Sequence, residues 1–435
     1  MHDVLDSRDL VPDEAEQRAH SGYDVGVLLE EARVAAAASD FDGLDRIAAA
    51  LNALPLSSSW RYSEPDDELE LRLLASRASA LPVVESELPS RVRGAWLGRT
   101  VGNTMGKPVE GLPRADVERY LRAGGDWPQT GYVPFVTPHP EGVGDLHWSA
   151  PFSSKGTFED VPRDDDIDWT ILGLHMLERY GRDITTEQIA AEWLDCLPFT
   201  QTFTAERAAY RNLIQGLKAP ETATHVNPYR EWIGALIRGD IFGYVHPGDP
   251  AAAAVLSLKD ARLSHVKNGI YGEMWAAALL AAAFSTSDAR VAIEESLKVV
   301  PDESRLAEAV RGVLDLHSAG VTHVEALDWI DTNLGHYNWV HTINNAAILA
   351  VGLLWGRTFT EAVAITISGG EDTDSTGATA GSVYGALHGS DAIPAELVGT
   401  THVHVRSAVR GFDRVTIDEL TERTLAIVQL PGGAS

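Results

Sequence analysis

The chain has 435 residues, 44% of them hydrophobic, and carries 63 acidic side chains against 35 lysines and arginines. The formal net charge of −28 argues against nucleic-acid backbones and anionic membrane surfaces as partners, because both repel an acidic protein. It does not exclude a small anionic substrate, since a bound divalent cation can reverse the local field. The composition therefore predicts a folded protein with a sizeable core that acts on neither nucleic acid nor membrane.

Cysteine content and hydropathy indicate the compartment. Cys196 is the only cysteine, so the chain cannot form an internal disulfide, which fits a reducing cytoplasm. Residues 1–6 lack the basic start and apolar run of a signal peptide. The most apolar stretch, 274–284, is too short to span a bilayer. We expect a cytoplasmic protein.

Residues 1–86 form a first region with a character of its own. Apolar residues recur at helical spacing through 27–38 and 44–54, and a polar loop follows over 57–68. This region contains no combination of residue types that is typical of catalysis. We therefore predict a helical N-terminal extension, 1–86, that docks on a main domain over 87–435 or mediates assembly.

Helical patterns dominate the main domain. An amphipathic helix is expected to end at Gly181, and further helices are expected over 251–260, 273–284, 344–355 and 360–368. No series of strands long enough for a large sheet is present. The sequence therefore predicts an all-α fold.

Two segments of the main domain have an unusual composition. Glycines at 377, 381 and 385 recur every fourth residue, which predicts a bare helix face that another backbone can approach closely. Residues 124–158 are rich in glycine, proline and aromatic side chains, and we interpret them as a long functional loop.

Two acidic runs could carry chemistry: 164–168, which reads Asp-Asp-Asp-Ile-Asp, and 371–375, which reads Glu-Asp-Thr-Asp-Ser. Either run alone could cap a helix and interact with its dipole. Four carboxylates in five residues exceed what one helix start requires, however, and their repulsion is relieved by a cation. Hard oxygen ligands favour Mg²⁺, Mn²⁺ or Ca²⁺. Together the runs predict a divalent-metal site.

Three segments, in this order, resemble the signature of the ADP-ribosylglycohydrolase family, which includes the dinitrogen-reductase-activating glycohydrolases. Residues 94–110 match Gly-Ala-x-x-Gly…Gly-Asp-Ala-x-Gly-x-Pro-x-Glu, and residues 164–166 match Thr/Ser-Asp-Asp at a helix start. Residues 369–377 match Gly-Gly-Asp-Thr-Asp-Thr-x-Gly, with Glu371 inserted. The resemblance extends over roughly residues 90–390.

The resemblance implies a compact multi-helix fold that holds two divalent cations, Mg²⁺ or Mn²⁺, in a central cleft. By the same resemblance, the metal ligands would be Asp164, Asp165, Asp166, Asp372, Asp374 and Ser375. The catalytic residues would be Glu110, Asp165 and Asp374. Glu110 matches a glutamate of the family that contacts the metal site or gates the substrate.

The match also departs from the family pattern. Asp164 stands where Thr or Ser is usual, Ser375 where Thr is usual, and Asn103 where Asp is usual, while Ile167 replaces a hydroxyl residue. The extra carboxylate adds charge at the metal site and alters how a sugar would be presented. These departures favour a divergent branch with a substrate other than ADP-ribosyl-arginine.

Other polar residues near predicted helix starts are candidates for substrate binding. Each of these residues could bind sugar or phosphate, or could instead make a structural hydrogen bond or cap a helix. They are His265, Asn268, His341 and Asn344. Among the tryptophans, Trp127 and Trp148 in the long loop could stack on a base, whereas Trp275 is expected in the core.

Three functional hypotheses follow. The first is a metal-dependent hydrolase that cleaves an N- or O-glycosidic bond to ribose and removes ADP-ribose from a protein or small molecule. The second keeps this chemistry but replaces ADP-ribose with a nucleoside or another furanoside. The third is a non-catalytic relative that binds ADP-ribose or has a structural role; so many unbalanced carboxylates argue against it.

Overall fold

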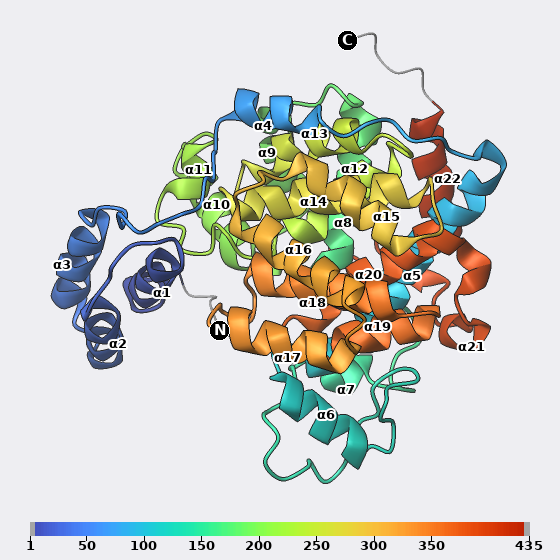
Figure 1. Cartoon of the computed structure of the whole chain (residues 1–435), viewed down its shortest axis with the longest axis horizontal. Coiled ribbons are helices and arrows are strands. Elements are labelled where there is room, and N and C mark those ends of the chain that lie inside the picture. Colours follow the sequence, from blue (N-terminus) through green and yellow to red (C-terminus); the bar gives the residue numbers. More distant parts are fainter. Residues whose placement is uncertain (1–4, 430–435) are drawn as a thin grey trace.

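Regular structure is almost entirely helical in the computed structural model of the chain, which describes residues 5–429 (Figure 1). Within that range, the strands are β1 (His404–Val405) and β2 (Val415–Thr416). They pair antiparallel, with Val405 opposite Val415. The prediction of an all-α fold is confirmed.

The described residues form helices of very different lengths. The α-helices are α1 Ser7–His20, α2 Leu28–Ala38, α3 Phe41–Asn52, α4 Glu68–Ala75, α5 Leu88–Gly106, α6 Arg114–Ala123, α7 Ala150–Ser153, α8 Asp165–Tyr180, α9 Thr186–Cys196, α10 Thr204–Ile214, α11 Glu221–Thr224, α12 Asp240–Tyr244, α13 Pro250–Ala261, α14 Asn268–Ala283, α15 Ala289–Ser296, α16 Arg305–Ser318, α17 His323–Leu334, α18 Thr342–Trp355, α19 Phe359–Ile367, α20 Thr373–His388, α21 Ala395–Val398 and α22 Ile417–Val428. Short 3₁₀ turns are η1 Glu85–Glu87, η2 Lys107–Val109, η3 Phe199–Gln201, η4 Leu236–Arg238, η5 Leu297–Val299 and η6 Ser390–Ala392.

Helices α1 to α3 form a small bundle beside the main body, with an apolar cluster of their own that includes Val11, Leu44 and Leu51 (Figure 1). Helix α1 was not predicted, because it contains Pro12 and lacks a clear apolar face. Helix α4 already belongs to the main body, because Leu71 and its neighbours join the large core. The boundary at residue 86 stays a prediction.

A buried polar network attaches the N-terminal bundle to the main body. Gln17 and Ser21 donate hydrogen bonds to Glu231 at 2.9 and 2.8 Å. The guanidinium of Arg305 pairs with Glu231 at 2.5 Å and with Glu64 at 2.9 Å. Each of these buried carboxylates is therefore paired and hydrogen-bonded, which offsets the cost of its desolvation.

The longest main-body helix, α5, packs along α20 through facing glycines (Figure 1). A Cβ atom at Gly98 would lie 2.0 Å from the Gly381 carbonyl oxygen, and one at Gly102 would lie 2.0 Å from that of Gly377. The predicted bare face at every fourth residue is confirmed. Because the helices are antiparallel, the C-terminal end of α5 meets the N-terminal end of α20.

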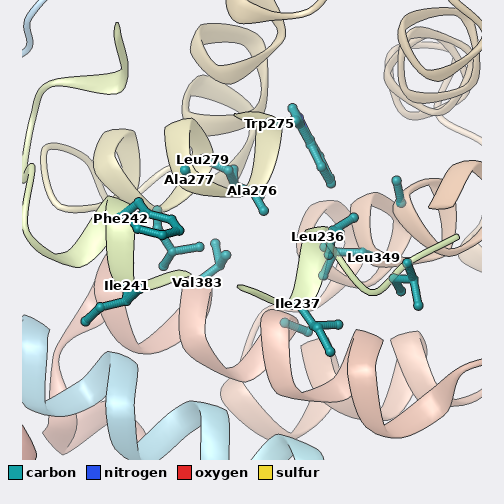
Figure 2. Close-up of a cluster of buried hydrophobic side chains, with 14 of the residues drawn as sticks. Leu236, Ile237, Ile241, Phe242, Trp275, Ala276, Ala277, Leu279, Leu349 and Val383 are labelled. Atoms are coloured by element: carbon teal, nitrogen blue, oxygen red, sulfur yellow. The ribbon is translucent and has the colours of Figure 1, made fainter. Parts of the chain in front are cut away.

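Helices α14 and α18 are buried on nearly all sides and lie within the main core. Trp275, Ala276 and Leu279 of α14 pack near Leu349 of α18 and Val383 of α20 (Figure 2). The predicted core position of Trp275 is confirmed. None of the helices within residues 5–429 is both long and apolar enough to cross a membrane.

Candidate metal centre and active-site cleft

The loop after α5 and the turn before α20 are joined by backbone hydrogen bonds. Gly111 donates to the Glu371 carbonyl at 2.9 Å, and Glu371 donates to the Leu112 carbonyl at 3.1 Å. Gly370 and Glu371 have φ of 72° and 65°, a left-handed conformation that reverses the chain and suits the glycine. This connection brings Glu110 to the start of α20.

The start of α8 is the third part of the site, and α5 positions it. Asn103 donates from Nδ2 to Asp164 Oδ1 at 3.0 Å and to Asp166 Oδ2 at 3.1 Å. The buried guanidinium of Arg99 donates to the Asp166 carbonyl at 2.7 Å. Asp164 also caps α8, since its Oδ1 accepts from the Asp166 amide at 3.0 Å. The capping interpretation of this run thus holds for Asp164, but it leaves the other carboxylates unexplained.

The carboxylates gather into two groups that share Asp374. Asp164, Asp166 and Asp374 form one, and Glu110, Asp372 and Asp374 form the other, with one oxygen per residue within 4.8 Å of the others in each group. Asp372 is the N-cap residue of α20, yet its side chain makes no capping hydrogen bond. Its carboxylate is therefore available to the cluster.

Ser375, the remaining predicted ligand, adjoins both runs. Its hydroxyl donates to Asp166 Oδ2 at 3.3 Å. The six predicted metal ligands consequently converge from α8 and α20, although only 164, 166, 372 and 374 fall within the two carboxylate groups. Asp165 lies at the same cleft, half-buried and outside both groups.

Burial and mutual repulsion shift the protonation of this cluster. Burial raises the pKa of Asp166 and Asp372 well above the usual range, and neighbouring carboxylates raise it further. Burial, and secondly the negative charge of Asp164, raise the pKa of Asp165 to about 7. Asp164 is the exception: despite its burial, the Lys107 ammonium and hydrogen bonds lower its pKa. So many carboxylates repel one another strongly unless cations are present.

The donor set fits a hard divalent cation. Asp166 and Asp374 are 1% and 3% exposed. Within residues 5–429, Oδ1 of each has no hydrogen-bond partner. Buried carboxylate oxygens without partners are costly, and coordination of a cation would satisfy them. Carboxylate and hydroxyl oxygens, without nitrogen or sulfur, suit Mg²⁺ or Mn²⁺.

One protein cation already lies inside the cluster. The Lys107 ammonium contacts Asp374 Oδ2 at 2.7 Å and Glu110 Oε2 at 3.0 Å, and it also pairs with Asp164. Burial alone would favour the neutral amine, but these carboxylates outweigh it and raise the pKa of Lys107 well above its usual value. The lysine is therefore a fixed positive charge.

The cluster forms the base of a cleft of about 380 Å³. Trp148, Phe203 and Trp339 contribute aromatic surface to its walls. His147 lies 3.3 Å from Glu110 through Nδ1. Burial and the Lys107 charge lower the pKa of His147 to about 4, so the imidazole is neutral near pH 7. An acidic base with aromatic walls can bind a polar sugar beneath a planar group.

The long loop over 124–158 supplies His147 and Trp148 to this cleft, which agrees with its interpretation as a functional loop. Trp127, the other loop tryptophan considered for base stacking, does not line it and packs against the main core. The buried Cys196 has its pKa raised to about 11, chiefly by burial, so its thiol is neutral.

The four residues predicted to bind substrate do not line the cleft. His265 is buried beside Ser264, Asn268 belongs to the Glu64–Glu231 network, and His341 caps α18. Asn344 donates to Glu371, in the turn before α20, at 3.4 Å. Each has a structural hydrogen bond, so the placement favours the structural alternative, and substrate binding by these residues stays a prediction without support.

Three residues of the cleft were not predicted as site residues: Lys107, His147 and Phe203. Lys107 could have been predicted from the sequence, because it lies three residues before Glu110 in the segment that matches the family signature. Phe203 follows α9 in a segment without any motif, and only the fold places it at the cleft.

Comparisons with known proteins identify the family. The sequence model of the ADP-ribosylglycohydrolase family matches residues 85–432. One solved structure, described as an ADP-ribosylglycohydrolase-related protein complex, is 20% identical over 79% of this chain and 98% of its own, with a TM-score of 0.47. No curated protein sequence matches the chain. The chain thus belongs to the ADP-ribosylglycohydrolase family, whose members are in general metal-dependent glycohydrolases.

Proposed function

We propose that the protein is a divalent-metal-dependent hydrolase that cleaves a glycosidic bond to ribose, with an ADP-ribosyl protein or small molecule as substrate. The observation that carries the proposal is the convergence of α5, α8 and α20 on two carboxylate groups that share Asp374. Family membership supports the reaction class. Mg²⁺ or Mn²⁺ would be held by the carboxylates of both runs together with Ser375.

The chemistry of the cleft fits this reaction. A bound divalent ion would supply Lewis-acid polarisation and a more acidic water. The carboxylates favour the positive charge that develops at the anomeric carbon in the transition state. Asp165 and Glu110 are less buried than their neighbours and face the cleft, where each can accept a proton from water or donate one to the leaving group.

The surroundings of the cleft favour a phosphate-bearing substrate. Trp148, Arg163 and Phe203 also line an adjacent hollow of about 720 Å³. That hollow is bordered by Arg207, Arg406 and Arg414, of which Arg406 pairs with Asp413 and Arg414 with Asp160. A ribose held above the carboxylates could therefore extend its phosphates towards arginines, which bind phosphate well.

A nucleoside or other furanoside is the second candidate. Among the residues that the structure describes, the lysine and arginine side chains lining the cleft itself are Lys107 and Arg163, and both pair with carboxylates. Within residues 5–429, the cleft thus offers no uncommitted lysine or arginine, which suits a substrate without phosphate. The departures at Asp164 and Ser375 also favour a substrate other than ADP-ribosyl-arginine.

A metal-supplemented substrate panel tests the proposal. The purified chain is incubated with Mn²⁺ or Mg²⁺ and with ADP-ribosyl-arginine, an O-linked ADP-ribosyl ester and nucleosides, and released ribosyl products are quantified. The proposal predicts release of ADP-ribose from an ADP-ribosyl compound and none after chelation. Cleavage of nucleosides alone would transfer the assignment to the second candidate, and metal binding without any turnover would favour a non-catalytic relative.

A further inference from the structure

The position of Lys107 bears on how many divalent ions the cleft holds. Its side chain is 8% exposed and enters the cluster from η2, directly after the glycine-packed end of α5. The close α5–α20 contact fixes this backbone, since a Cβ at Gly106 would lie 2.1 Å from the Thr373 carbonyl oxygen. The lysine is therefore held at the start of α20.

The ammonium contacts both carboxylate groups. It pairs with Asp164 of the first group, with Glu110 of the second, and with the shared Asp374. An ammonium has three N–H donors, and three carboxylates match them. Two divalent ions would need the same carboxylates and would lie close to the Lys107 ammonium, which repels them.

The two groups differ in which oxygens remain free. Glu110 Oε2 already has Lys107 at 3.0 Å and His147 at 3.3 Å. By contrast, Asp166 Oδ1 and Asp374 Oδ1 have no hydrogen-bond partner among the described residues, although the Arg99 guanidinium lies 3.8 Å from Asp166 Oδ1. A divalent ion is therefore best accommodated on the Asp166 side, and the ammonium supplies the positive charge on the Glu110 side.

We propose that Lys107 takes the place of one of the two divalent ions implied by the family resemblance, so that the cleft binds a single divalent ion through Asp166 and Asp374. This inference rests on the proposed metal-dependent function. It makes Lys107 a positioning residue, whose ammonium keeps Glu110 and Asp164 in place.

Counting bound ions tests the inference without an activity assay. The full chain is stripped with chelator, and Mn²⁺ binding is measured by equilibrium dialysis and by electron paramagnetic resonance. We expect one Mn²⁺ per wild-type chain, with the six-line spectrum of an isolated ion. Lys107→Met should bind a second Mn²⁺ and show the broadened spectrum of a coupled pair. Lys298→Met, which removes an exposed lysine elsewhere, should still bind one.

The outcomes separate this inference from the proposed function. Two ions per wild-type chain, with metal-dependent turnover, would overturn the role of Lys107 and leave the function intact. No bound ion in the wild type would overturn both. If the wild type binds one ion and a folded Lys107→Met variant also binds only one, Lys107 does not take the place of a second ion. If Lys107→Met does not fold, Lys107→Gln replaces it, and the wild-type count decides in any case.

Discussion

Asp374 belongs to both carboxylate groups at the cleft, and it is also paired with Lys107. Loss of its charge should therefore disturb both Lys107 and any divalent ion held by either group. Asn has nearly the same shape as Asp, so the substitution removes ligand strength with little change in packing.

Asp374→Asn should reduce metal-dependent turnover by about 10³-fold or more, because metal catalysis supplies several kcal/mol of transition-state stabilisation. Turnover is measured at saturating Mn²⁺, and circular dichroism checks the fold. Asp391→Asn, at an exposed position, is the matched control and should retain full activity. Wild-type activity in Asp374→Asn would remove this residue from the site.

At the residue scale, the sequence predicted the carboxylates but not their cation. The acidic runs are recognisable because repeated aspartates are unusual and occur in motifs. The Lys107 contact was not predictable from local pattern, since its partner Asp374 is 267 residues away in the chain. The histidines and asparagines failed to gather at the cleft because a polar residue at a helix start serves caps and buried networks equally well.

At the scale of elements, the glycine contact between α5 and α20 aligns the metal ligands. The facing glycines recur through Gly94, Gly98 and Gly102 of α5, each against a backbone carbonyl of α20. The every-fourth-residue repeat made this contact predictable. The sequence did not predict which helix packs against this glycine face, because that depends on contacts between distant parts of the chain.

Gly98→Ala should destabilise the protein by about 1–3 kcal/mol, since a methyl group in a filled interface forces the helices apart. Its Cβ would lie 2.0 Å from the Gly381 carbonyl oxygen, a rigid backbone atom. Thermal unfolding and turnover should both be affected, because Lys107 and the start of α20 are displaced. Gly131→Ala is the control: its Cβ would lie 3.5 Å from Leu397, an ordinary contact. Equal stability of the two variants would contradict the tight contact.

A histidine whose protonation depends on pH, His20, lies where the N-terminal bundle attaches to the main body. His20, at the end of α1, lies near the rings of His336 and His341, and its backbone carbonyl accepts a hydrogen bond from the Arg305 guanidinium at 2.8 Å. Burial lowers the pKa of His20 from 6.5 to about 4, and the charges of His336 and Arg305 contribute, while Glu231 opposes them. As the pH falls, His20 is therefore protonated at a lower pH in the folded protein than in the unfolded chain.

The lowered pKa of His20 makes the folded protein less stable at acidic pH. Stability from the neutral His20 is fully present above about pH 6.5 and is lost as the pH falls from 6.5 towards 4, by on the order of 3 kcal/mol. His20→Gln should therefore lose less stability than the wild type between pH 7 and pH 5, measured by denaturant unfolding. His139→Gln, at an exposed position, should follow the wild type. Identical pH slopes for His20→Gln and wild type would exclude His20 as the acid-sensitive group.

At the scale of the whole molecule, the fold was largely predictable and the substrate was not. The helical periodicity and the absence of strand patterns led to the all-α class, and three ordered motifs led to the family. The cleft walls come from Trp148, Phe203 and Trp339, which lie in loops without a shared motif, so specificity depends on tertiary placement.

The account requires that catalysis and cation binding depend on the same carboxylates. The most direct measurement is turnover of an ADP-ribosyl substrate by chelator-stripped protein as free Mn²⁺ is increased. The account predicts no measurable release of ADP-ribose without metal, and a saturable rise as Mn²⁺ is added, which Asp374→Asn lacks. Release at an undiminished rate in excess chelator would contradict it.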